Sequence, residues 1–414
     1  MLLAVGAADG GRRLLAPREA PAQPAPVALE TYFSPDEVRR GCAFARPQLA
    51  VALARAAIDL GMLGLLVKRP PAVLTRRFKR PILGALAGGA GLSVALTVPS
   101  LPLAALARER ARSVGLVTQS WQGWSVDLLK GTGIQAALAA AGGGAVVAAT
   151  RRYPRRWWIP TAAGSVLAVA ALAGISPVLL DPLFNDFTPL PDGPTRSDVF
   201  ELAGAAGVDV GEVYSVDASR RTTAANAYVT GLGPTKRVVV FDTLLRRYSR
   251  NEVRVVVAHE LAHVRNRDVL RSIAYGAIVA PAAALAVQRL SWILLGDREP
   301  GTAASLPALA LAAAIVLAPV GLVGNRLSRA IERRADDYSL ALSGSPEAFV
   351  SFERAIALQN AADLDPPRWL TALIATHPST LERIGAAVAW SRRDDADFTG
   401  PIAQTPSRRI PAGS

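Results

Sequence analysis

Residues 302–325 read TAASLPALALAAAIVLAPVGLVGN and contain no charged side chain. About 20 apolar residues are enough for a helix to cross the hydrocarbon core of a bilayer. Three further uncharged runs are long enough to do the same, at residues 82–107, 131–150 and 157–180. Buried helices of a large soluble core are the alternative, but four such runs seldom occur together. Because 51% of the 414 residues are hydrophobic as well, the sequence predicts a multi-pass membrane protein.

Two more spans are predicted at residues 48–67 and 272–296, although both contain ionisable side chains. Arg55 and Asp59 stand one helical turn apart in the first of them, and Arg289 interrupts the second. A charge that faces lipid is costly. We therefore expect Arg55 and Asp59 to pair with each other or to face water inside the helix bundle.

The segment VVVAHELAHV, residues 255–264, holds two of the three histidines of the chain. At 3.6 residues per turn, His259 and His263 lie on one face of a helix and can bind the same metal ion. Glu260 is placed to act on a catalytic water, as in the H-E-x-x-H motif of zinc peptidases. An amphipathic helix with a structural histidine pair is the alternative. The scarcity of histidine and the adjacent glutamate favour a zinc site.

A catalytic zinc needs three protein ligands and one open position. A third histidine in the metzincin arrangement would stand at position 269, which is Val269. An acidic residue on a later helix remains possible, and the segment SRAIERRADD, residues 328–337, offers Glu332. Asp336 lies one turn further on, where it can accept a hydrogen bond from a ligating histidine. A solvated glutamate in an arginine-rich helix is the alternative for Glu332.

The third histidine, His377, lies in the segment THPSTLER at residues 376–383, away from the other two. A hydrogen-bond donor or a cation near the scissile carbonyl would stabilise the negative charge that develops on its oxygen. Both His377 and Arg383 can supply such a group. A helix-capping or surface histidine is the alternative.

Together these segments make the chain resemble the type I CaaX prenyl protease family. Its members are integral-membrane zinc endopeptidases of the gluzincin group. The resemblance implies one zinc ion per chain, bound by His259, His263 and Glu332, with Glu260 as the general base and Asp336 orienting a ligand. The blocks that carry it are PLFNDFTPLP at 182–191, NAY at 226–228 with a glycine at 231, KRVVVFDTLL at 236–245, HELAH with ERRAD at 332–336, and THPSTLER.

The same resemblance implies roles near the substrate. His377 and Arg383 would assist at the oxyanion or the substrate, and Asn226 would contact the substrate backbone beside an edge strand. Two features depart from the eukaryotic prenyl proteases. Those enzymes have a histidine two residues before the asparagine, where this chain has Ala224, and they have an extra N-terminal membrane helix, for which the first apolar run here is too short.

We predict a mainly α fold, a polytopic membrane helix bundle with a zincin-like catalytic domain that contains a small β-sheet. In the first catalytic region, a helix at about 197–206 precedes strands at 212–218 and 237–241, with a turn at Gly233 and Pro234. The expected organisation is an N-terminal polar tail (1–47), transmembrane helices (48–180), a catalytic region (181–270), a membrane hairpin (271–325), a second catalytic region (326–395) and a disordered tail (396–414).

The net charge of +13 raises the question of a nucleic-acid partner. The basic residues lie in short loops between spans and across the catalytic regions, without a nucleic-acid motif. Membrane orientation or anionic lipid explains them more simply. We therefore expect a peptide or protein substrate, contact with membrane lipid and no nucleic acid. The short basic loops at residues 68–80 and 151–156, if cytoplasmic, would put the catalytic domain outside the cell, whereas the resemblance implies that it lies on the cytoplasmic side; we follow the resemblance. The abundance of arginine and alanine suggests a bacterial cell membrane.

These observations predict a membrane-embedded zinc endopeptidase that hydrolyses peptide bonds with an activated water. Two alternatives stay open. One is a quality-control protease of misfolded membrane proteins, and the other is a zinc-binding membrane scaffold or chaperone that does not cleave. Glu260 argues against the scaffold, because a structural zinc site is normally closed by four protein ligands and needs no base.

Overall fold

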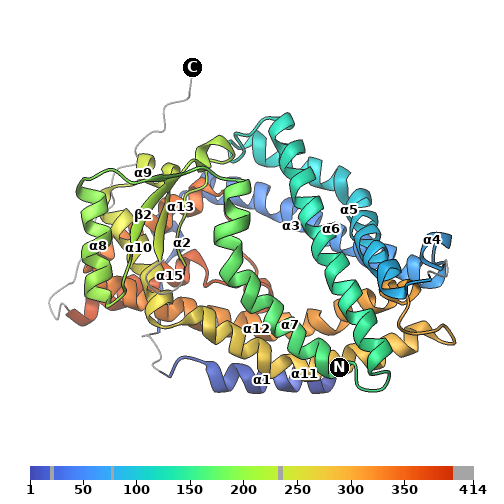
Figure 1. Ribbon diagram of the computed structural model, residues 1–414. Helices are drawn as coiled ribbons and strands as arrows, with labels where there is room; N and C mark the ends of the chain where they lie inside the picture. Colours follow the sequence, from blue (N-terminus) through green and yellow to red (C-terminus); the bar gives the residue numbers. More distant parts are fainter. Residues whose placement is uncertain (19–22, 76–78, 232–235, 395–414) are drawn as a thin grey trace.

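The computed structural model describes residues 1–18, 23–75, 79–231 and 236–394. Within these residues, six helical stretches are long and apolar enough to cross a membrane (Figure 1). Each overlaps one of the predicted spans almost completely. They are formed by α3 (Pro35–Lys68), α5 (Pro81–Ser113), α6 (Trp121–Arg152), α7 (Trp158–Ile175), α11 (Asp268–Leu295) and α12 (Leu306–Ser343). The predicted turn at residues 233–234 and the predicted tail at 396–414 lie outside the described residues.

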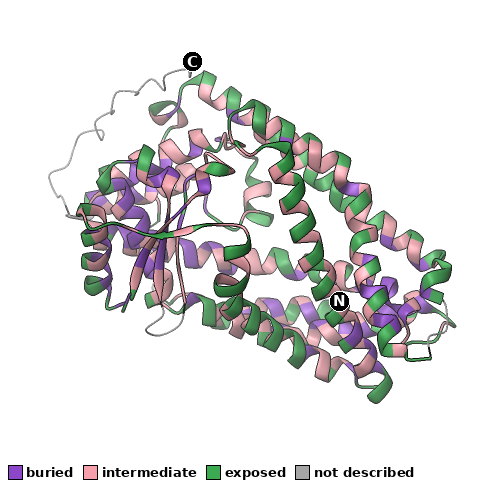
Figure 2. Cartoon of the chain, turned by 45° about the horizontal axis from the view of Figure 1, so that its top comes forward, coloured by how far each residue is buried: buried purple, intermediate pink, exposed green. Residues whose placement is uncertain are grey.

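The apolar stretches of these helices are largely exposed. In the stretch Trp158–Leu183, none of the most apolar 18-residue window is buried, and in the other five stretches at most 33% is buried. Figure 2 shows the contrast between these helices and the region around the sheet, where buried residues gather. Apolar surface of this extent is not left in contact with water. It faces the lipid of a bilayer, as the sequence predicts.

Small residues allow α5 and α6 to pack closely. A Cβ atom at Gly89 would lie 2.3 Å from the carbonyl oxygen of Ala139, and one at Gly143 would lie 3.2 Å from that of Ala85. Membrane helices associate through such close backbone contacts, since lipid gives no hydrophobic driving force between them. In α3, the Asp59 carboxylate accepts a hydrogen bond from the buried hydroxyl of Ser100 at 3.0 Å.

The region predicted to be catalytic contains a mixed four-stranded sheet with the strand order β1-β2-β4-β3. Strands β2 and β4 are parallel, and the two outer strands are antiparallel to their neighbours. The strands predicted at 212–218 and 237–241 correspond to β2 and β4, and the helix predicted at 197–206 corresponds to α8. The bounds are β1 (Phe187–Pro189), β2 (Glu212–Val216), β3 (Ala227–Thr230), β4 (Arg237–Phe241) and α8 (Pro194–Ala206).

The apolar run of β4 joins the sheet to the helices that cover it. Val238 and Val240 are fully buried and pack in one cluster with Leu202 of α8 and with Val257 and Leu261 of α10 (Arg250–Arg265). This packing holds α10 against the sheet. The shorter helices of this part of the chain are α9 (Asp242–Arg247), α13 (Pro346–Gln359), α14 (Arg368–Leu373) and α15 (Thr380–Asp394).

Residues 1–47, expected to form a polar tail, contain folded helices instead. Helix α1 (Leu2–Leu15) packs along α11 and α12, with Ala4 and Ala8 buried against them (Figure 1). Phe33, which follows α2 (Leu29–Tyr32), is buried in a cluster with residues of α13 and α15. The small side chains of α1 explain the difference, because they permit close packing in a run too short to be recognised as a membrane span. The short helix α4 (Ala72–Thr75) lies between α3 and α5.

Candidate metal centre

Helix α10 carries both histidines and is fixed at its start and along one face. The Ser249 hydroxyl accepts a hydrogen bond from the Glu252 backbone N–H, and the Glu252 carboxylate accepts one from the Ser249 N–H, forming a capping box. Val257 and Leu261 face the sheet. His259 and His263 lie one turn apart on a different face of α10. This face is turned toward α12, where Glu332 lies close to both rings.

Helix α12 brings the third donor to the histidines. It runs from the apolar stretch through to Glu332 and Asp336, both of which are buried. The Nε2 atoms of His259 and His263 lie 3.2 Å apart. The Glu332 carboxylate lies 3.3 Å from the first Nε2 and 3.7 Å from the second.

This arrangement fits a tetrahedral metal ion. Two ligands at about 2.1 Å from a tetrahedral zinc lie about 3.4 Å from each other, close to the three observed separations. The donor set, two imidazoles and one carboxylate, is also one that zinc prefers. The structure thus brings together the predicted residues His259, His263 and Glu332 as a group able to hold one metal ion.

Each histidine directs its other ring nitrogen at a buried carboxylate. Nδ1 of His259 lies 2.9 Å from Asp336, the residue predicted for this position. Nδ1 of His263 lies 3.1 Å from Asp268, which the sequence reasoning missed. The only available signal was an acidic residue five positions after His263, and such a residue is equally typical of the first turn of a helix.

Charge around His259 favours its protonated form. Burial opposes the positive charge, but the carboxylates of Asp336 and Glu332 outweigh it and raise the pKa of His259 to about 10. A metal ion that binds here therefore displaces a proton.

Glu260 lies beside the metal ligands and has a different environment. Burial raises the pKa of its carboxyl, although the neighbouring histidines act in the opposite direction. No hydrogen bond or ion pair engages its carboxylate among the residues that the structure describes. A carboxylate that is free to accept a proton and has a raised pKa is suited to general-base chemistry.

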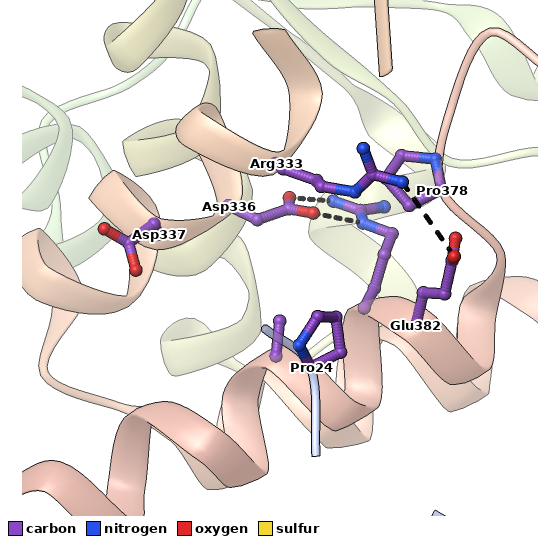
Figure 3. Close-up of a pocket in the computed structure, with 8 residues that line it drawn as sticks. Pro24, Arg333, Asp336, Asp337, Pro378 and Glu382 are labelled. Atoms are coloured by element: carbon purple, nitrogen blue, oxygen red, sulfur yellow. Dashed lines mark hydrogen bonds and ion pairs between the residues drawn. The ribbon is translucent and has the colours of Figure 1, made fainter. Parts of the chain in front are cut away.

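Arg383 lies behind Asp336. Its Nε donates to Asp336 at 2.9 Å, and a second N–H donates to the other oxygen of the same carboxylate; Figure 3 marks both contacts as dashed lines at Asp336. Nη1 of Arg383 lies 2.6 Å from Glu353. Burial opposes the charge of Arg383, yet the carboxylates of Asp336 and Glu353 raise its pKa above the usual range. Burial also raises the pKa of Glu353 to about 7, although Arg383 partly opposes this shift. The guanidinium is thus occupied by two carboxylates of the protein.

The remaining predicted residues lie nearer to solvent. The His377 side chain is 62% exposed, and its Nε2 lies 3.5 Å from the Glu332 carboxylate. Asn226 is exposed and directly precedes β3, which is one of the two edge strands of the sheet. Its side-chain oxygen accepts a hydrogen bond from the backbone N–H of Ala227.

The fold and the donor group define a class of protein: a multi-pass membrane protein with a metallopeptidase-type metal site. Residues 189–391 match the model of peptidase family M48. The chain is 30% identical to metalloprotease YhfN of Bacillus subtilis over 302 residues, which cover 71% of this chain and 70% of that protein. The chain belongs to peptidase family M48 and is a membrane-embedded, zinc-dependent metallopeptidase.

Two further comparisons agree with this assignment. The chain is 31% identical to CAAX prenyl protease 1 of Saccharomyces cerevisiae over 156 residues, which cover 37% of this chain and 34% of that protein. The fold is also similar to the crystal structure of S. mikatae Ste24p, with a TM-score of 0.75, 19% identity and coverage of 93% of this chain and 95% of the other. This confirms the predicted architecture of a helix bundle with a small catalytic sheet.

Proposed function

We propose that His259, His263 and Glu332 bind one zinc ion and that Glu260 is the general base of peptide-bond hydrolysis. The observation that supports this most directly is the convergence of three side chains: the two Nε2 atoms lie 3.2 Å apart, and the two oxygens of the Glu332 carboxylate lie 3.3 Å and 3.7 Å from them. Bound zinc supplies a Lewis acid that polarises the scissile carbonyl and lowers the pKa of a water.

The protein side chains perform the proton transfers. Glu260 takes a proton from the attacking water as the new carbon–oxygen bond forms, and it delivers this proton to the nitrogen as the peptide bond breaks. No covalent intermediate with the enzyme is needed. His377, close to Glu332 and open to solvent, donates a hydrogen bond to the carbonyl oxygen as negative charge develops on it.

The substrate that we propose is an extended peptide or protein segment. Strand β3 pairs with β4 on one side, and no strand pairs with its other edge among the described residues. A substrate that adds to this edge would be held by main-chain hydrogen bonds, which accept many sequences. Asn226, exposed at the start of β3, is placed to bind the substrate backbone.

The central test compares the wild type with Glu260→Gln in detergent. Both proteins should bind about one zinc ion per chain, and only the wild type should cleave an unstructured reporter peptide. Glu347→Gln, which changes an exposed glutamate on α13, is the matched control and should retain both properties. Zinc binding without cleavage of any peptide by the wild type would favour the scaffold function, whereas cleavage by Glu260→Gln at the wild-type rate would refute the proposed base.

The substrate distinguishes two possible peptidase functions, cleavage of prenylated peptides and general cleavage of extended or misfolded segments. One relative is named CAAX prenyl protease 1, but the aligned part is about a third of that protein. We therefore propose general cleavage of extended segments, which also suits quality control of misfolded membrane proteins. A pair of peptides that differ only in a prenyl group should be cleaved at similar rates, and a strong preference for the prenylated peptide would favour the prenyl protease function.

We also propose that the catalytic regions face the cytoplasm of a bacterial cell. Their basic flanks support this orientation. In a Cys42→Ser background, Glu347→Cys on α13 and Arg155→Cys in the α6–α7 loop would report on opposite ends of the bundle, since both positions are exposed. An impermeant maleimide applied to intact cells should label Arg155→Cys alone. Labelling of Glu347→Cys alone would reverse the orientation.

A further inference from the structure

We infer that Asp268 is a positioning residue that orients His263 for metal binding, as Asp336 does for His259. The inference rests on the proposed metal ligands. Asp268 begins α11, the membrane helix that follows the histidine helix, and it is 5% exposed. One of its carboxylate oxygens, Oδ2, lies 3.1 Å from Nδ1 of His263, while Nε2 of the same ring faces His259 and Glu332.

The contact selects the tautomer of His263. A carboxylate only accepts hydrogen bonds, so Nδ1 must carry the ring proton and donate it to Asp268. Nε2 is then left with a free lone pair directed at His259 and Glu332, which is the form that a metal ion requires. Buried carboxylates in this position fix ring orientation and raise the basicity of metal-ligating histidines.

Asp268 is itself held in place by two arginines. Its other oxygen, Oδ1, accepts a hydrogen bond from Arg334 on α12 and lies 3.3 Å from Nε of Arg271 on α11. Arg271 also donates to the backbone carbonyl of Leu15, at the end of α1, at 2.6 Å. Arg267, just before Asp268, has a φ of 55°, a left-handed conformation that is strained for a residue with a side chain.

The two oxygens of Asp268 therefore have different partners. For this reason the variant Asp268→Asn tests whether Asp268 selects the tautomer of His263. Both arginines can only donate hydrogen bonds. In Asp268→Asn, the amide oxygen would face the arginines and the amide NH₂ would face Nδ1 of His263. Nδ1 would then act as the acceptor and the ring proton would move to Nε2, where it blocks the metal. A similar loss through the wrong tautomer is documented for the aspartate of the serine protease triad.

The test measures zinc affinity by chelator competition on detergent-purified full-length protein. We expect Asp268→Ala to bind zinc about 10- to 100-fold more weakly than the wild type. Asp268→Asn should bind zinc at least as weakly as Asp268→Ala, although it preserves the shape of the side chain. A purely structural role predicts the opposite order, because asparagine would disturb the packing less than alanine.

The matched control is Asp198→Asn. Asp198 is 3% exposed and pairs with Arg250 and Arg254, but it contacts no histidine. Like Asp268→Asn, this variant should lower the unfolding temperature of the metal-free protein, while its zinc affinity should stay within about twofold of the wild type. His263→Ala serves as the reference for loss of a ligand. If His263→Ala kept wild-type zinc affinity, the proposed ligand set would fail.

Three results would overturn the role of Asp268 while leaving the metal centre in place. They are wild-type zinc affinity in Asp268→Asn, a milder loss in Asp268→Asn than in Asp268→Ala, and an equal loss of zinc affinity in Asp198→Asn.

Discussion

Replacement of Arg383 by methionine tests whether this residue supports the metal centre or contacts the substrate. Arg383 is the shared cation of two buried carboxylates, since the side chains of Asp336 and Glu353 are 2% and 3% exposed. Methionine fills a similar volume without charge. Removal of one partner from a buried ion pair typically costs about 3–5 kcal/mol, because the remaining charge stays buried without compensation.

We expect the loss of stability in Arg383→Met to fall in the lower half of this range. Glu353 can take up a proton when Arg383 is lost, because its pKa is already about 7. Asp336 keeps the imidazole of His259 as a partner. We therefore expect Arg383→Met to lower the stability of the metal-free protein by about 3 kcal/mol and its zinc affinity by about 10-fold, because Asp336 would no longer be held against His259.

The assay combines thermal unfolding by tryptophan fluorescence in the presence of a chelator with zinc competition and peptide cleavage. His377→Ala is the contrasting variant, since the exposed side chain of His377 should contribute little to folding. It should keep wild-type stability and zinc affinity and should lower kcat about 10²- to 10³-fold. If Arg383→Met behaved in this way instead, with normal stability and zinc binding but a low kcat, Arg383 would contact the substrate and the reasoning from its buried partners would be wrong.

Three further perturbations test other parts of the structure. Gly89→Ala should lower the unfolding temperature, because the new Cβ would lie 2.3 Å from the Ala139 carbonyl oxygen. The control is Gly91→Ala, whose new Cβ would meet no atom within 4 Å and should be neutral or slightly stabilising. Burial raises the pKa of Glu353 from 4.5 to about 7, so the folded state binds more protons, and the stability of the metal-free protein should fall as the pH rises from about 4.5 to 7. Glu353→Gln should remove this slope in unfolding experiments across that range. Zinc binding near pH 7 should release protons, measurable as a buffer-dependent heat, because the pKa of His259 is about 10.

The membrane spans and the residues proposed as metal ligands could be predicted because both depend on local sequence patterns. A run of apolar residues determines a membrane helix wherever it occurs. A spacing of four residues places His259 above His263, and Glu332 above Asp336, in any helix. The sequence of the membrane hairpin between these pairs does not show how α10 and α12 pack against each other. The third ligand could still be predicted, because a catalytic zinc needs three protein donors.

The short strands and the N-terminal helix could not be recognised in this way. Strands β1 and β3 have three and four residues, too few to show an alternating pattern. Helix α1 consists largely of small and apolar residues, and its position depends on the faces that α11 and α12 present to it. Such elements are determined by tertiary packing rather than by their own periodicity.

Arg383 shows most clearly where sequence reasoning reaches its limit. An arginine in the segment that contains His377 is chemically suited to bind an oxyanion, and the sequence carries nothing against that role. Of its actual partners, Asp336 lies 47 residues earlier on α12, and Glu353 lies on α13. In the sequence, Glu353 is acceptable as a solvated acid, and nothing links either carboxylate to Arg383. Only their joint burial makes a cation between them necessary, because two carboxylates removed from water require compensation. The same argument applies to Asp268 and Arg334. Asp336 could be placed from its spacing to Glu332, whereas its contact with Arg383 and the contacts of Asp268 with His263 and Arg334 follow from three-dimensional packing.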